Sequence, residues 1–139
     1  MSSARPARLG RGVPAEDGPG AEVIAAESLN GDPVINAKGE ELGRISDVML
    51  DMRRGCVAYA VLASGGFLGI GDKLFAVPWS ALMLDADRKC FILDIDRRRL
   101  ESAPAFDKES WPSMADSRWA TKVHSYFGVR PYWQAAALQ

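Results

Sequence analysis

The stretch Gly55–Trp79, GCVAYAVLASGGFLGIGDKLFAVPW, decides the fold. It holds an apolar run, Cys56–Ala63, and a shorter return run, Lys73–Val77, on either side of a glycine-rich loop. The first run is apolar throughout, so both faces of a strand there would be apolar, and it is rich in strand-forming residues. This pattern favours a strand covered on both sides. Its eight residues are too few for a typical helix, and glycines flank it closely at both ends. The stretch therefore predicts two buried strands joined as a hairpin.

The loop of this hairpin raises two questions. Phe67 and Leu68 stand at its tip, where apolar side chains need a partner. The span Gly66–Gly71 has the four-residue gap of a phosphate-binding loop. However, Asp72 takes the place of the lysine, Leu74 takes the place of the magnesium-binding Ser or Thr, and a strand follows where a helix is required. A structural hairpin is the favoured interpretation.

Further short strands are predicted on both sides of the hairpin. They cover Val34–Asn36, Glu41–Met52 and Lys89–Ile95, and turn-forming residues separate them. The alternation in Glu41–Met52 is imperfect, and a bulge near Ser46-Asp47 would restore one apolar face. Short strands at this spacing are typical of a small all-β barrel. The predicted fold is therefore mainly β, a bent barrel of about six strands.

The chain divides into three parts. Residues 1–20 are rich in Gly, Pro, Ala and Arg without a hydrophobic period, so we expect a disordered tail. The barrel is expected over residues 21–105. Residues 106–139 form a C-terminal extension with one helix over about 116–127, capped by Asp116 and ended by Gly128.

The extension carries an unusual amount of aromatic surface. Trp119, Val123 and Phe127 recur at intervals of four and form an apolar stripe along the predicted helix. A helix this short is marginal in water, so it must dock either on the barrel's outer surface or on a second subunit. Large apolar residues of the loop tip and the extension are the candidate interface: Phe67, Leu68, Trp79, Trp111, Trp119, Phe127, Tyr132 and Trp133.

Composition restricts the function classes. The chain has 139 residues, a mass of 15.1 kDa and a net charge of −1, which suit one domain and give no basic footprint for nucleic acid. No run has the roughly 20 apolar residues of a membrane span, and the N-terminus lacks the apolar core of a secretory signal. We therefore expect a cytoplasmic protein without a membrane span that does not bind nucleic acid.

The residues that could carry chemistry do not converge. Cys56 and Cys90 lie in apolar runs without metal-ligand spacing, and we expect two buried, reduced thiols, with a disulfide as the alternative. The single histidine, His124, is expected at a surface or an interface. Carboxylates such as Asp47 and Asp51 fit the solvated face of a sheet better than an acid–base pair. We predict no catalytic residue, no metal and no cofactor.

An ordered series of residues resembles the PRC-barrel family. The resemblance rests on the following motifs: Gly39-Glu40-x-Leu42-Gly43-x-Ile45-x-Asp47, Asp51, Gly55-x-Val57-x-Tyr59, Gly65-Gly66-Phe67-Leu68-Gly69-x-Gly71-x-Lys73 and Val77-Pro78-Trp79. It covers about residues 27–105, and the tail FDKESWP…YFGVRPYW is similar to the extension of stand-alone bacterial members. The family includes the cytoplasmic part of the photosynthetic reaction centre H subunit and the C-terminal domain of a ribosome maturation factor.

The resemblance implies a small, highly bent barrel used for assembly and protein contacts, without a family-wide active site. Together with the aromatic extension, it leads to the hypothesis of a non-enzymatic module that forms a homodimer or higher homo-oligomer and contacts an unidentified protein. A ribosome- or RNA-associated accessory factor is one alternative, supported by the cluster Arg97-Arg98-Arg99. A small-ligand-binding regulatory barrel is the other, supported only by the glycine loop.

Overall fold

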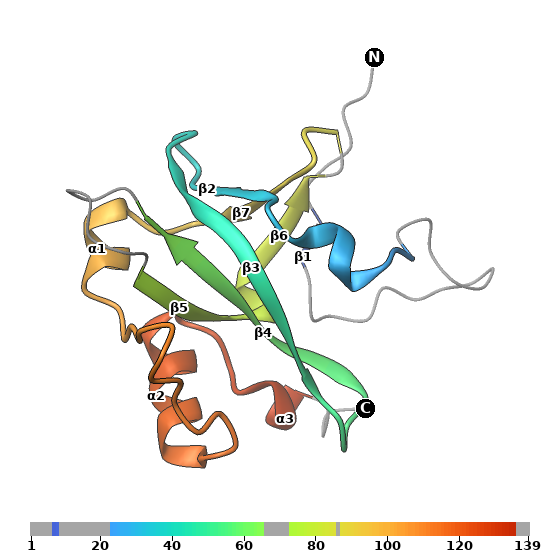
Figure 1. Cartoon of the computed structure of the whole chain (residues 1–139), viewed down its shortest axis with the longest axis vertical. Coiled ribbons are helices and arrows are strands. Elements are labelled where there is room, and N and C mark those ends of the chain that lie inside the picture. The colour runs from blue at the N-terminus through green and yellow to red at the C-terminus, as the bar shows by residue number, and fades with distance from the viewer. Residues whose placement is uncertain (1–6, 9–22, 66–72, 86, 136–139) are drawn as a thin grey trace.

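The computed structural model describes residues 7–8, 23–65, 73–85 and 87–135. Its strands form one curled, mixed sheet in the order β1-β6-β7-β2-β3-β4-β5 (Figure 1). The strands are β1 (Ala7–Arg8), β2 (Pro33–Ile35), β3 (Glu41–Asp51), β4 (Cys56–Ser64), β5 (Lys73–Pro78), β6 (Leu82–Asp85) and β7 (Cys90–Leu93). The helices are η1 (Ala26–Leu29), η2 (Trp79–Ala81), α1 (Arg97–Glu101), α2 (Ser117–Tyr126) and α3 (Tyr132–Ala135). The predicted mainly β fold with six principal strands and a C-terminal helix is confirmed.

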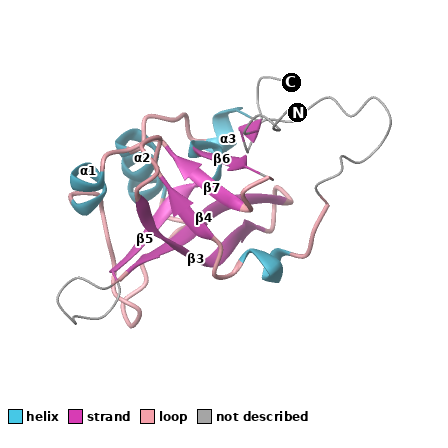
Figure 2. Ribbon diagram, turned by 90° about the horizontal axis from the view of Figure 1, so that it is seen from above, coloured by secondary structure: helices cyan, strands magenta, loops and turns pink. Residues whose placement is uncertain are grey.

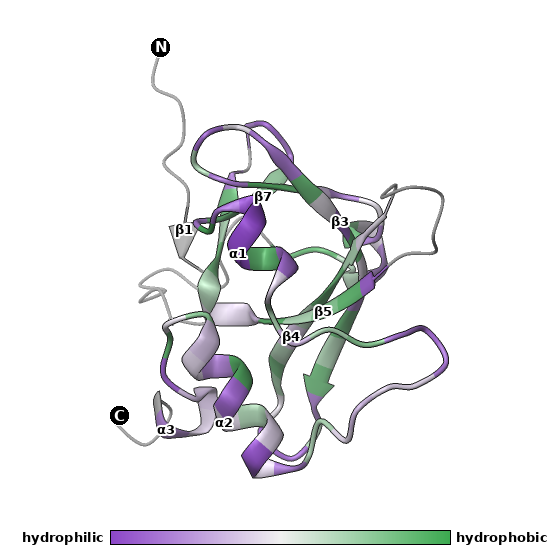
Figure 3. Ribbon diagram, turned by 90° about the vertical axis from the view of Figure 1, so that its left-hand side faces the viewer, coloured by the Kyte–Doolittle hydropathy of each residue, from purple (hydrophilic) through white to green (hydrophobic). Residues whose placement is uncertain are grey.

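The hairpin that decides the fold has the expected pairing. β4 pairs antiparallel with β5 from Tyr59↔Pro78 to Ser64↔Lys73. β4 is buried on both faces over residues 58–62, as predicted from its apolar run. The loop between them, with Phe67, Leu68 and the glycine-rich span, lies outside the described residues. Figure 3 shows β5 coloured as hydrophobic, whereas α1 is coloured largely as hydrophilic.

The barrel is built around a long, bent hairpin of β3 and β4. Its register shifts between Ile45 and Asp47, where the sequence predicted a bulge. Gly43 permits the close approach of the two strands, because a Cβ atom there would lie 2.5 Å from the carbonyl oxygen of Ala63. The bend lets one sheet curl around an apolar interior that includes Leu42, Leu62, Phe75 and Phe91.

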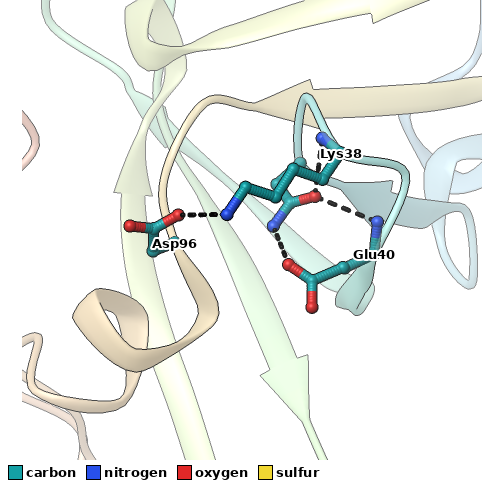
Figure 4. Close-up of polar contacts among 4 residues, drawn as sticks. Lys38, Glu40 and Asp96 are labelled. Atoms are coloured by element: carbon teal, nitrogen blue, oxygen red, sulfur yellow. Dashed lines mark hydrogen bonds and ion pairs between the residues drawn. The ribbon is translucent and has the colours of Figure 1, made fainter.

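A polar turn connects β2 to β3. The buried Asn36 accepts hydrogen bonds at its side-chain oxygen from the backbone N–H groups of Lys38 (3.0 Å) and Glu40 (2.9 Å). Its amide nitrogen donates to the Glu40 carboxylate, and Lys38 forms an ion pair with Asp96 at 3.5 Å (Figure 4). Gly39 has φ +84°, a left-handed conformation that glycine adopts without steric cost. This turn fixes where β3 begins and ties it to the segment before α1.

The two chain ends lie mostly outside the described residues. Of the predicted tail, only Ala7–Arg8 is described, and it pairs with β6. At the other end, the extension runs along the outside of the sheet, and Figure 2 shows α1, α2 and α3 on the same side of the strands. The boundaries of α2 match the prediction, because the Asp116 side chain accepts from the backbone N–H of Arg118 and Gly128 has φ +71°.

Candidate functional site

The C-terminal extension packs on the outer face of its own sheet. Val123 of α2 is fully buried there against Ala58, Tyr59 and Ala76, which β4 and β5 present. An isolated bridge between Leu74 and Phe106 adds backbone pairing at the edge of β5. Of the two docking places that the sequence allowed, the structure therefore shows the barrel's own surface.

Aromatic rings fill this contact around Tyr59. Its ring centre lies 5.4 Å from that of Trp119, 5.4 Å from that of His124 and 6.1 Å from that of Tyr132. All three contacts are edge-to-face, the arrangement that the quadrupoles of aromatic rings favour. Trp133 continues the cluster at 5.4 Å from His124. Much of the aromatic surface of the extension is thus used inside the chain.

His124 is completely buried in the cluster. Its Nδ1 lies 2.7 Å from the carbonyl oxygen of Ala120, so Nδ1 carries the proton and donates. Nε2 is then an acceptor, and no group within the described residues donates to it. Burial lowers the pKa of His124, which keeps the imidazole neutral. Of the two expected places, a surface or an interface, His124 does not lie at the surface, and the interface that it occupies lies within one chain.

The Tyr59 hydroxyl is a second buried polar group without a hydrogen-bond partner in the described part of the chain. Burial raises the pKa of Tyr59 to about 12, so the phenol is neutral. Buried polar groups are nearly always satisfied in stable interiors. At the interface between the extension and the barrel, the aromatic rings are therefore well packed, but the Tyr59 hydroxyl and Nε2 of His124 have no hydrogen-bond partner within the described residues.

A polar latch ties α3 to the turn between β3 and β4. The Tyr132 hydroxyl donates to Oδ2 of Asp51 at 2.6 Å, and Oδ1 accepts from the backbone N–H groups of Arg53 and Arg54. The hydrogen bonds from Tyr132 and the Arg54 backbone lower the pKa of Asp51. Burial and the neighbouring Asp51 raise the pKa of Tyr132. The latch leaves this carboxylate satisfied.

Beside the latch lies a groove of about 650 Å³, the hairpin groove. Its walls come from the β3–β4 hairpin on one side and from the extension on the other, and they include Met49, Met52, Arg53, Met114, Tyr132 and Trp133. Leu50 also lines the groove, and the side chains of Leu50 and Met52 are 56% and 82% exposed. We call the groove together with these two exposed side chains the hairpin surface.

The predicted interface residues fall into different places. Trp119, Phe127, Tyr132 and Trp133 are half-buried within the chain, and Trp79 packs at 6.0 Å from Phe91. Trp111 is 40% exposed, with its ring against Phe106 and its N–H donating to the Lys108 carbonyl. Phe67 and Leu68 lie outside the described residues. The structure brings Tyr132 and Trp133 together in the hairpin groove.

Sequence reasoning missed the hairpin residues Leu50 and Met52. The available signal was their place at the end of a predicted strand, although Met52 itself lies in the turn after β3. The thiol prediction also needs correction, because Cys56 is exposed at the start of β4, where the turn ends, and only Cys90 is buried. Both thiols are free, and the strands that carry them, β4 and β7, are not neighbours in the sheet.

A second, smaller groove of about 330 Å³ lies where α2 ends. Arg99 lines it, with its guanidinium 4.5 Å above the ring centre of Tyr126 and a 2.9 Å hydrogen bond to the Tyr126 carbonyl.

Within the described ranges, no three His, Cys, Asp or Glu side chains gather in a way that could hold a metal ion. Over the same ranges, no helix is long and apolar enough to cross a membrane.

Comparisons with known proteins show which family and which solved structure the chain is similar to. Residues 21–100 match the PRC-barrel domain, whereas a search of curated proteins finds no match. A solved structure that resembles it is that of a protein from Pseudomonas aeruginosa described as a 16S ribosomal RNA processing protein, RimM. The identity is 18% and the TM-score 0.40, over 62% of this chain and 50% of the other, so this chain spans half the length of that relative. Because the family match covers more than half of its length and includes every strand from β2 to β7, the chain belongs to the PRC-barrel family.

Proposed function

We propose that this PRC-barrel chain is a non-enzymatic assembly module that associates with a second copy through the hairpin surface. The observation that carries the proposal is the exposure of Leu50 and Met52 in the lining of a largely apolar groove. Isolated exposed apolar residues are ordinary, but exposed ones that line a groove are typical of a protein contact.

The arrangement of the hairpin surface suits contact between identical chains. A twofold interface requires one patch that is complementary to itself. Here the exposed apolar side chains of Leu50 and Met52 line a groove, so the groove of each copy can receive apolar side chains of the other. Three methionines in the walls, Met49, Met52 and Met114, add flexible side chains that adapt to a partner's shape.

Light scattering tests the proposal. Wild-type protein at high micromolar concentration should have a mass above the 15.1 kDa of one chain. Met52→Glu should shift it towards the monomer, because it places a charge in the contact. Thr121→Glu adds the same charge on the exposed side of α2 and should leave the mass unchanged. A monomeric wild type, or equal masses for all three proteins, would contradict the proposal.

An RNA- or ribosome-associated role is the second candidate, and the distribution of charge favours it. Residues 97–139 contain seven Lys and Arg against four Asp and Glu, whereas residues 21–96 contain seven against twelve. Arg98, Arg118, Lys122 and Arg130 are exposed, and none of them forms an ion pair within the described residues. Arg118 and Lys122 lie one turn apart on the outer side of α2, so they can contact phosphates together.

Cosedimentation with ribosomes separates the two candidates. An RNA contact predicts binding that weakens steeply with salt and is lost in Arg118→Glu/Lys122→Glu. Met52→Glu should leave such binding intact, since the hairpin surface does not include α2's outer side. Ribosome binding that is absent at low salt would remove this candidate.

A further inference from the structure

A second exposed apolar pair lies at the start of the described chain. Val23 is 74% exposed and Ile24 is 52% exposed, so these two and the hairpin pair account for four of the five large apolar side chains that the described residues expose. The segment that follows the pair is anchored, because Leu29 of η1 is buried in the barrel interior. The backbone N–H of Gly31 also donates to the Ile45 carbonyl at 2.7 Å.

The sequence around this pair is strongly acidic. The acidic segment, residues 16–27, contains Glu16, Asp17, Glu22 and Glu27 and no Lys or Arg. Glu27 is exposed in the structure. An apolar pair flanked by carboxylates is complementary to a surface that is apolar and basic.

The hairpin surface has this opposite character. Its apolar wall is bordered by Arg53 and Arg54, both exposed. Its one carboxylate, Asp51, is already occupied by Tyr132 and by the backbone of the two arginines, and Arg54 lies 3.8 Å from it. No ion pair within the described residues involves the Arg53 side chain. The surface therefore offers uncompensated positive charge next to apolar side chains.

We propose that the hairpin surface of one copy binds the acidic segment of a second copy, with Val23 and Ile24 in the hairpin groove and the flanking glutamates facing Arg53 and Arg54. The inference rests on the proposed self-association and names the two surfaces that meet. The contact cannot form within one chain in the observed arrangement, since Val23 and Ile24 are exposed and are not part of the groove's walls. Figure 1 shows η1 at the right of the view and the β3–β4 turn at its bottom, two separate places at the edge of the molecule.

Charge reversal on full-length protein tests the contact. The segment variant Glu22→Lys/Glu27→Lys and the hairpin variant Arg53→Glu/Arg54→Glu should each weaken self-association by about tenfold or more, because like charges then face each other. An equimolar mixture of the two variants should associate again, since each segment then meets an oppositely charged hairpin. Combining all four changes in one chain should restore self-association for the same reason.

Two controls keep the outcomes distinct. Lys122→Glu changes an exposed charge on the outer side of α2 and should have no effect, and thermal unfolding checks that every variant folds. If the wild type associates but the mixture of variants does not, the assignment of these two surfaces is overturned while the proposed function stands. If only the hairpin variant loses association, another part of the second copy occupies the groove, which also overturns the assignment. A wild type that is monomeric at every concentration overturns the proposed function itself.

Discussion

Truncation of Val123 measures how strongly the extension is held on the barrel. Val123 is 1% exposed and packs against β4 and β5, so Val123→Ala removes two buried methyl groups. At about 0.8 kcal/mol for each, with a cavity contribution added and the better helix propensity of Ala subtracted, the free energy of unfolding should fall by about 2 kcal/mol. For a chain of this size, that corresponds to a Tm lower by about 6 °C.

Urea unfolding followed by tryptophan fluorescence and by far-UV circular dichroism provides the measurement. Trp119 lies in the contact and reports its loss, and coincident transitions would show that the extension and the barrel unfold together. Thr121→Ala is the matched control on the exposed side of the same helix and should change the stability by less than about 0.5 kcal/mol. Equal stability of Val123→Ala and Thr121→Ala would refute the docking of α2.

Three further predictions follow from the buried polar groups and the thiols. Tyr59→Phe should leave thermal stability unchanged or raise it by up to about 1 kcal/mol, because the hydroxyl that it removes is buried without a partner; a loss above about 1 kcal/mol would show that a partner exists. The pKa of His124 is lowered in the folded state, so the unfolded chain binds a proton first as the pH falls, and the stability should decline below about pH 6.5. His124→Gln should flatten this decline, which is measured as the urea midpoint between about pH 7.5 and about pH 5.5. An identical pH dependence in both proteins would contradict this prediction. Cys56 should react with Ellman's reagent in the native protein and Cys90 only after unfolding, and fewer than two thiols in unfolded, non-reduced protein would reveal a disulfide.

Local signals in the sequence were sufficient for the barrel. The bulge near Ser46-Asp47 and the cap at Asp116 each depend on residues close in the chain, and both are confirmed. Hydrophobic pattern also identified β4 as a strand covered on both faces, although what covers its outer face was open.

The candidate site depended on information that a single sequence lacks. The stripe of Trp119, Val123 and Phe127 predicted a docked helix, but one stripe fits a barrel surface and a second subunit equally well. His124 is buried because the sheet and α3 enclose that side of α2, which only the tertiary arrangement decides. Likewise, Leu50 lies at the end of β3 and Met52 in the turn after it, and the sequence does not state whether another part of the chain covers their side chains.

Sedimentation equilibrium of the wild-type chain across a range of concentrations tests the central claim most directly. Self-association through the hairpin surface predicts a weight-average mass that rises from the 15.1 kDa of one chain as the concentration increases. The rise should be smaller at high salt, because Arg53 and Arg54 contribute through exposed charges. A mass that stays at 15.1 kDa up to high micromolar concentration and at low salt would contradict the account.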